Sequence, residues 1–373
     1  MKAMQEIQRI VTNRHEVAKE WKAKTEGKVF GYLSHDIPEE LIYAAGVLPV
    51  RILGSHEPEV ITDPYMWNMM HRVFERDCLA QGLQGRYSYL DGIISIARDP
   101  HISQCYYSWI QHIPIPYNYE FQTAAVLGGR RVVDYLRGEI EDFKQSLEAW
   151  TGKPISDKSI DHAIELYDQT RRLVKQISEF RKDDVPKITG AEFMEIALAG
   201  MLTDKAEYNH LLEQLVKEIP KRKVPDGQGV RIMLVGGTND HIDLIRAIET
   251  MGVQIVVDDH STSGRYYVTE VIPEADRLHA LAVRMVNKPR SPLADLPERT
   301  RPAYLLNLAR EYKVQGSIFM IQRGDDAEEF DYPANRKPLE DNNIPTLVLE
   351  LDFTNPVEQF RTRVEAFLET LES

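Results

Sequence analysis

The stretch of residues 30–54 constrains the fold more than any other part of the chain, because it holds two apolar runs separated by a helical pattern. The runs at 30–33 and 47–53 have the length and composition of buried strands. Pro38 suits the first turn of a helix, where its fixed φ is compatible and its missing N–H costs nothing. Gly46 ends that helix. We therefore predict a β-α-β unit within an α/β fold whose strands are mainly parallel.

A polar loop, Ser34-His35-Asp36, joins the first predicted strand to this helix. In open α/β sheets, ligands bind beyond the carboxyl ends of the strands. The loop is therefore the first candidate for a functional site.

A second β-α-β unit is predicted at residues 230–257. A strand at 230–235 is followed by the glycine-containing turn 236–240, a helix that ends at Gly252, and a strand at 253–257. Backbone N–H groups in such a turn can hold an anion, but a tight turn without a ligand is an equally good interpretation. The turn is not GxGxxG and has no P-loop lysine, so we do not expect a nucleotide site.

The segment 221–229, KRKVPDGQG, is the clearest break in the sequence. We predict an N-terminal α/β domain at 1–220 and a C-terminal α/β domain at 221–373, both with Rossmann- or flavodoxin-like sheets. A helical segment should join them, with helices at 122–151, 156–181, 189–203 and 205–219. The other predicted elements are helices at 4–26, 64–83 and 100–109, strands at 89–97, 316–321 and 346–351, and a Pro- and Tyr-rich connector at 111–120.

The composition narrows the class of protein. A chain of 373 residues with 43% hydrophobic and 28% charged residues is typical of a soluble globular protein with two domains. The net charge of −13 argues against a nucleic-acid partner, which requires a basic surface. Neither a membrane-length apolar run nor a secretory leader is evident, so we expect no membrane association and a cytoplasmic location.

Only two cysteines are present, Cys78 and Cys105. An iron–sulfur cubane normally needs about four thiolates, or three with one open iron position. Both cysteines fall in predicted helices, where we interpret them as small buried residues.

Several segments together resemble one known superfamily. The first unit reads Gly-Tyr, then Pro-Glu-Glu-Leu-Ile-x-Ala-Ala-Gly-x-Leu-Pro-Val, and Leu-Asp-Gly follows at 90–92. The segment 258–266, DDHSTSGRY, and the C-terminal run from Gln315 add further matches. These segments resemble the 2-hydroxyacyl-CoA dehydratase and benzoyl-CoA reductase superfamily, whose members are subunits of oxygen-sensitive iron–sulfur enzymes. The resemblance covers most of residues 28–110 and 228–371.

In that superfamily, three cysteines from separate loops typically hold one [4Fe-4S] cluster. Counting from neighbouring matches places these cysteines at Arg72, Asp99 and Asp325 of this chain. Arginine cannot ligate iron, and carboxylates are poor partners for iron that prefers thiolate. The resemblance therefore implies that this chain has lost its cluster. We expect the three residues to converge in space and to pair, because an unpaired buried charge costs several kcal/mol.

The resemblance implies a function within a complex. The length and the N-terminal NRHEVAKEWKAKTEGK are most like the small subunit of ATP-dependent benzoyl-CoA reductase, which reductively dearomatises an aromatic acyl-CoA. The implied partners are a cysteine-bearing homologous subunit, ATP-hydrolysing activator subunits and the acyl-CoA substrate. The [4Fe-4S] clusters are then expected in the partner subunits, with no cofactor in this chain.

Five residues are candidates for contact with the substrate in that role. His35 is the candidate proton donor, since an imidazole titrates near working pH, although it equally fits a helix start without chemistry. The candidates for substrate binding are Ser34, Asp36, Arg265 and Tyr266.

Two alternative functions remain open from the sequence. One is a subunit of a 2-hydroxyacyl-CoA dehydratase, which eliminates water through a ketyl radical. The other is a binding or scaffold paralogue that kept the fold and lost the reaction.

Overall fold

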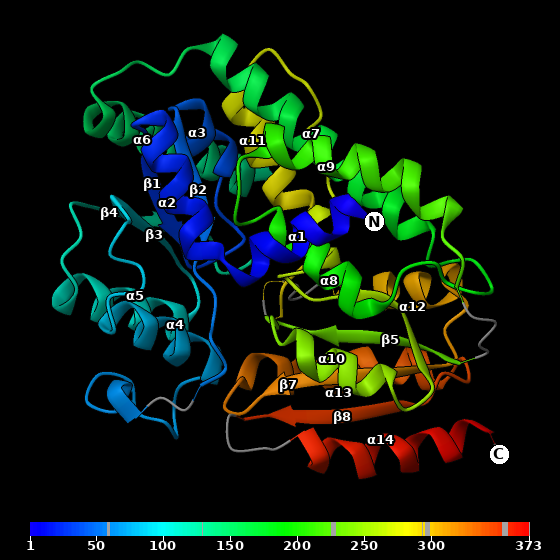
Figure 1. The fold of residues 1–373 in the computed structure, drawn as a ribbon. Coiled ribbons are helices and arrows are strands. Elements are labelled where there is room, and N and C mark those ends of the chain that lie inside the picture. The colour runs from blue at the N-terminus through cyan, green and yellow to red at the C-terminus, as the bar shows by residue number, and fades with distance from the viewer. Residues whose placement is uncertain are drawn as a thin grey trace.

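Two parallel four-stranded sheets form the framework of the computed structural model (Figure 1), which describes residues 1–57, 60–128, 130–224, 229–292, 294, 299–352 and 357–372. The strand orders are β2-β1-β3-β4 and β6-β5-β7-β8, and every described pairing is parallel. This confirms the predicted α/β fold. The strands are β1 (Lys28–Tyr32), β2 (Val47–Arg51), β3 (Gly92–Ala97), β4 (Tyr117–Gln122), β5 (Val230–Gly236), β6 (Val253–Asp259), β7 (Gly316–Gln322) and β8 (Thr346–Leu351).

Local sequence signals define where the helices begin. Asp99 accepts hydrogen bonds from two backbone N–H groups of α5, and Pro100 follows at the first helical position, where its missing N–H is not needed. Thr189 and Glu192 form a capping box at the start of α8. The helices near the first sheet are α2 (Arg14–Thr25), α3 (Glu39–Ala44), α4 (Val73–Leu83) and α5 (Pro100–His112).

The predicted helical segment between the two sheets is present. It consists of α6 (Arg130–Thr151), α7 (Asp157–Glu179), α8 (Gly190–Ala199) and α9 (Lys205–Glu218). Figure 1 shows α7 and α9, in green, along the top of the molecule, with the first sheet at the left and the second at the lower right. The remaining helices are α1 (Lys2–Thr12), α10 (Ile242–Glu249), α11 (Arg277–Asn287), α12 (Arg301–Glu311), α13 (Asp326–Glu340) and α14 (Val357–Glu372).

Helices from each half of the sequence pack against the other half. Helix α8 contacts α10 and β6 of the second sheet, whereas α11, from the second half, packs along α6. The main hydrophobic core is accordingly continuous, with residues such as Phe30 and Ile93 in one sheet and Ile232 and Leu234 in the other. None of the described helices has the length and hydropathy of a membrane span.

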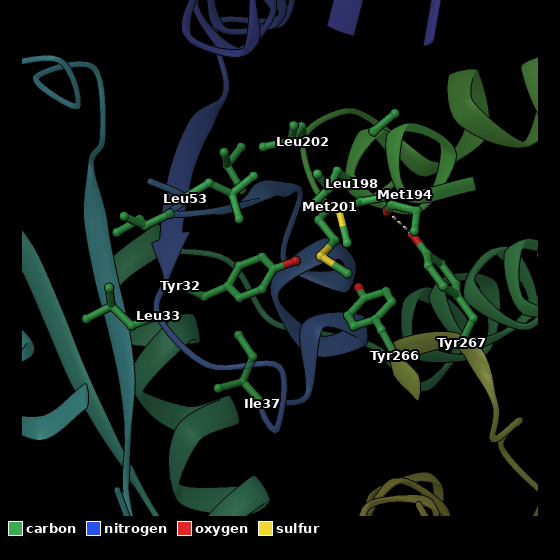
Figure 2. Packing of buried hydrophobic residues seen from close by; sticks show 14 of the residues in the cluster. Tyr32, Leu33, Ile37, Leu53, Met194, Leu198, Met201, Leu202, Tyr266 and Tyr267 are labelled. Atoms are coloured by element: carbon green, nitrogen blue, oxygen red, sulfur yellow. Dashed lines mark hydrogen bonds between the residues drawn. The ribbon is translucent and has the colours of Figure 1, made fainter. Parts of the chain in front are cut away.

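A buried aromatic cluster lies where the two halves meet (Figure 2). Tyr32 from β1 packs there with Met201, Tyr266 and Tyr267, all of them at most 5% exposed. The Tyr267 hydroxyl donates a hydrogen bond to the backbone oxygen of Ala197, which ties the turn after β6 to α8.

The helix predicted at 64–83 is wrong over its first half. In the structure a short 3-10 turn spans Val60–Thr62, and α4 begins only at Val73. Met66 is buried but Trp67, Met69 and Met70 are exposed, so this segment does not bury the continuous apolar face that an amphipathic helix presents. The single helix predicted at 4–26 is instead two helices, α1 and α2, separated at Asn13.

The connector predicted at 111–120 is also wrong in part, because it contains most of β4. Tyr117, Tyr119 and Phe121 alternate along this strand, which pairs with β3. Tyr117 stacks on Trp150 of α6 with ring centroids 4.4 Å apart, and this packing supports an edge strand. Helix α6 consequently begins at residue 130 rather than at 122.

Candidate functional site

A cavity of about 240 Å³ lies between the carboxyl ends of the two sheets. Loops after β1, β2 and β3 line it from the first sheet, and loops after β5, β6 and β7 line it from the second. The loop 34–36 and the residues Gly237 and Thr238 both face this space. The loops of both predicted β-α-β units thus line one cavity.

Arg72, Asp99 and Asp325 converge on one wall of this cavity although they are far apart in the sequence. The Arg72 guanidinium donates hydrogen bonds to Asp99 Oδ2 at 2.7 Å and to Asp325 Oδ2 at 3.1 Å. Each of the three residues directly precedes a helix: α4, α5 and α13, respectively. The predicted convergence and pairing are confirmed, and the assignment to former ligand positions rests on the resemblance.

A fourth residue, Glu75, belongs to this network, and the sequence analysis did not identify it. Arg72 Nε donates to Glu75 Oε2 at 3.0 Å and Nη2 donates to Oε1 at 2.7 Å, a bidentate pair. Burial raises the pKa of Glu75, Arg72 opposes this, and Asp99 adds to it, so that the pKa is about 7. The Arg72 guanidinium thus pairs with three carboxylates, and one of them, that of Glu75, titrates near neutral pH.

The donor set on this wall does not fit a thiolate-held [4Fe-4S] cluster. Arg72 has no lone pair for iron, and the two aspartates are engaged with it. Cys78 and Cys105 are fully buried and do not line the cavity, and burial raises the pKa of Cys78 well above its ordinary value. Within the described ranges there is no group of three or more His, Cys, Asp or Glu side chains arranged to hold a metal ion.

The loop after β1 contributes Ser34, His35 and Asp36 to the cavity. His35 Nε2 lies 3.1 Å from Asp36 Oδ1, and burial lowers the pKa of His35 well below its ordinary value, so the imidazole is neutral at pH 7. Burial raises the pKa of Asp36, but the cations Arg98 and Lys288 more than reverse this, so the carboxylate stays ionised.

The two candidates from the second half differ in position. Arg265 lines the cavity, and its guanidinium donates to the backbone oxygens of Gly236 and Gly237 at 3.2 and 3.3 Å. Tyr266 does not line the cavity. It lies in the aromatic cluster of Figure 2, where its hydroxyl donates to the Glu39 carboxylate at 2.6 Å.

The sequence analysis also missed Arg51 and Arg98, which line the cavity. A usable signal was present in both cases. Arg51 is a charged residue at the end of an otherwise apolar strand, and Arg98 directly precedes Asp99 at the end of another. Such positions lie at the carboxyl edge of a parallel sheet, where ligand contacts concentrate.

The fold and the site can be compared with known proteins. Residues 35–371 match the model of a family described as 2-hydroxyglutaryl-CoA dehydratase, D-component, and the chain belongs to this family. This confirms the superfamily indicated by the sequence.

Three curated relatives illustrate the range of this family. The chain is 30% identical to the (R)-phenyllactyl-CoA dehydratase beta subunit of Clostridium sporogenes, over 97% of this chain and 96% of that protein. It is 25% identical to one of the benzoyl-CoA reductase subunits of Thauera aromatica, over 88% and 86%. It is 24% identical to the beta subunit of (R)-2-hydroxyglutaryl-CoA dehydratase from Acidaminococcus fermentans, over 99% and 98%. The relatives are thus named as subunits of enzymes that act on CoA thioesters.

Proposed function

We propose that this chain is a subunit without its own cluster in an ATP-dependent iron–sulfur complex that transforms an acyl-CoA thioester. The observation that carries the proposal is the Arg72-Asp99-Asp325 network, three residues at three helix starts where the resemblance places the cluster cysteines. The [4Fe-4S] clusters then belong to a cysteine-bearing homologous subunit, and ATP-hydrolysing activator subunits supply its electrons.

Two reactions are candidates for this complex. The first is the reductive dearomatisation of an aromatic acyl-CoA, as in a benzoyl-CoA reductase, and the 25% identity to one subunit of such an enzyme supports it. The second is the dehydration of a 2-hydroxyacyl-CoA. The 30% identity to a phenyllactyl-CoA dehydratase subunit over nearly the whole chain favours this second candidate.

In either reaction the cavity between the sheets is the surface that this chain offers to the substrate. Ser34, Asp36 and Arg265 line it as candidate binding residues. His35 is the candidate proton donor. Because its imidazole is neutral in the resting protein, it must take up a proton when the substrate binds. Tyr266 lies outside the cavity, and its hydroxyl donates a hydrogen bond to Glu39 at the start of α3.

Anaerobic purification of the tagged chain from its native host tests this proposal. We expect a cysteine-bearing homologue to copurify, identified by mass spectrometry, through an apolar interface on the order of 2,000 Å² or more. ATP-dependent turnover of either benzoyl-CoA or a 2-hydroxyacyl-CoA should require both chains, and the substrate consumed distinguishes the two reactions. A soluble monomer by light scattering, with no partner recovered from the host, would contradict the proposal.

A further inference from the structure

Arg51 is a buried cation on the cavity wall that the proposed function does not use. It is the last residue of β2, only 1% exposed, and it lines the cavity. Its backbone N–H donates to the Met201 oxygen at 2.9 Å, which fixes the end of the strand. Its Nε and Nη1 groups have no hydrogen-bond partner.

The other arginines on the cavity wall all have carboxylate partners. Arg72 pairs with Asp99 and Asp325, and Arg98 pairs with Asp36. Arg265 Nη1 lies 3.6 Å from Asp259 Oδ2. Each of these charges is therefore compensated within the protein.

Arg51 differs, because no carboxylate in the described part of the chain lies within 4 Å of its guanidinium. Its neighbours are the aromatic rings of Tyr32 and Phe74, whose centroids lie 5.6 and 5.9 Å from Cζ. Such cation–π contacts stabilise a buried cation less than its desolvation destabilises it. The buried charge of Arg51 thus lacks a counter-ion, and the adjacent cavity has room for one.

We propose that the cavity binds a small organic carboxylate whose oxygens accept hydrogen bonds from Arg51. The planar guanidinium fork matches a carboxylate in geometry and charge. The cavity volume of about 240 Å³ is enough for a short acid but not for a whole coenzyme A. Apolar side chains also line the cavity and can pack against the hydrocarbon part of the acid: Ile96, Ile102 and Val126.

The carboxylate can come from either of two sources. The inference does not depend on which reaction the complex catalyses. The carboxylate belongs either to a free short-chain acid or to the far end of an acyl group carried by a thioester outside the cavity. A matched four-carbon set separates them: butyrate and its neutral amide butyramide, and succinyl-CoA and butyryl-CoA.

Isothermal titration of the full chain with these four compounds tests the proposal. We expect butyrate, or succinyl-CoA, to bind at least 10-fold more tightly than butyramide or butyryl-CoA, the counterpart that lacks the carboxylate. The pair that shows this preference identifies the source. Arg51→Met should weaken binding of the preferred compound at least 10-fold. Arg172→Met, which removes a cation from the exposed surface, should leave the affinity unchanged.

Equal binding of the two members of each pair, with and without the carboxylate, would overturn the proposal, as would an unchanged affinity of Arg51→Met. If Arg51→Met does not fold, Arg51→Lys tests the proposal instead. It keeps the positive charge but lacks the planar guanidinium that can donate two hydrogen bonds to one carboxylate. It should bind the carboxylate several-fold more weakly than wild type does, and an affinity equal to wild type would overturn the proposal.

Discussion

Arg72 joins three segments of the chain through a single guanidinium, which contacts Glu75, Asp99 and Asp325. With a relative exposure of 8% for the whole residue, it is largely removed from water. Such a network is stable only while every charge is paired, because removing one partner leaves buried charges without compensation.

We therefore expect Arg72→Met to lower the free energy of unfolding by about 3–5 kcal/mol, measured by urea denaturation. Neutralising the partners in the same protein, with Glu75→Gln, Asp99→Asn and Asp325→Asn, should recover part of this loss. The surface variant Arg172→Met should change stability by less than about 0.5 kcal/mol. A loss below about 1 kcal/mol for Arg72→Met would show that the network is not a buried charge cluster.

His56 and Asp240 connect the loops that follow β2 and β5, with Nε2 and Oδ1 3.1 Å apart. Burial lowers the pKa of His56, but Asp240 raises it more, to about 9. Because the folded-state pKa lies above the ordinary value of 6.5, the ion pair contributes its full stability below about pH 6.5. That contribution is lost as the pH rises through about 9.

The variant His56→Asn measures this contribution, since asparagine tolerates the positive φ of 60° at this position. The stability difference between wild type and variant should fall by about 1–2 kcal/mol from pH 6.5 to 9.5, after allowing for partial solvent screening. The surface variant Arg172→Met, which leaves every imidazole in place, should show no such dependence. A pH-independent difference for His56→Asn would refute the charged pair.

At the scale of elements, the turn after β6 places Arg265 on the cavity wall. A Cβ added to Gly264, the first residue of this turn, would lie 2.2 Å from the backbone oxygen of Asp258. Because that neighbour is backbone, the clash cannot be relieved by a side-chain rotation.

We expect Gly264→Ala to destabilise the protein by about 1–3 kcal/mol in thermal or urea unfolding. Gly138→Ala is a matched control, because Gly138 lies within α6 and an added Cβ meets nothing within 4 Å. That substitution should instead stabilise the protein by about 0.5–1 kcal/mol. Equal effects of the two substitutions would contradict the close approach seen at Gly264.

The elements that sequence reasoning predicted well are those whose signals are local. The strand and helix pattern around Pro38 and the capping residues of α5 and α8 depend only on neighbours in the sequence. The predictions for residues 64–72 and for strand β4 were wrong because the conformations of these segments depend on distant partners. In β4 these are β3 and Trp150 of α6, and no local signal predicts them.

At the scale of the whole molecule, two parallel sheets place their carboxyl ends around one cavity. The β-α-β units predicted the parallel sheets and the loop 34–36 as a candidate site, and the resemblance predicted that Arg72, Asp99 and Asp325 would converge. The uncompensated charge of Arg51 was not predictable, because a pairing, or its absence, depends on which side chains the folded chain brings together. Glu75 was missed for the same reason.

The central claim is that Arg72, Asp99 and Asp325 occupy the place of a lost iron–sulfur cluster. Anaerobic iron–sulfur reconstitution tests it by comparing wild type with a variant that carries Arg72→Cys, Asp99→Cys and Asp325→Cys. Glu75→Ala in the same variant removes the carboxylate that Arg72 otherwise neutralises. Circular dichroism establishes that the variant is folded before iron is measured.

Iron and acid-labile sulfide per chain give the answer. The account predicts no stoichiometric iron in wild type and about four iron atoms per chain in the cysteine variant, the content of one [4Fe-4S] cluster. A cluster bound by wild type through Cys78 or Cys105, or a folded cysteine variant that binds no iron, would contradict it.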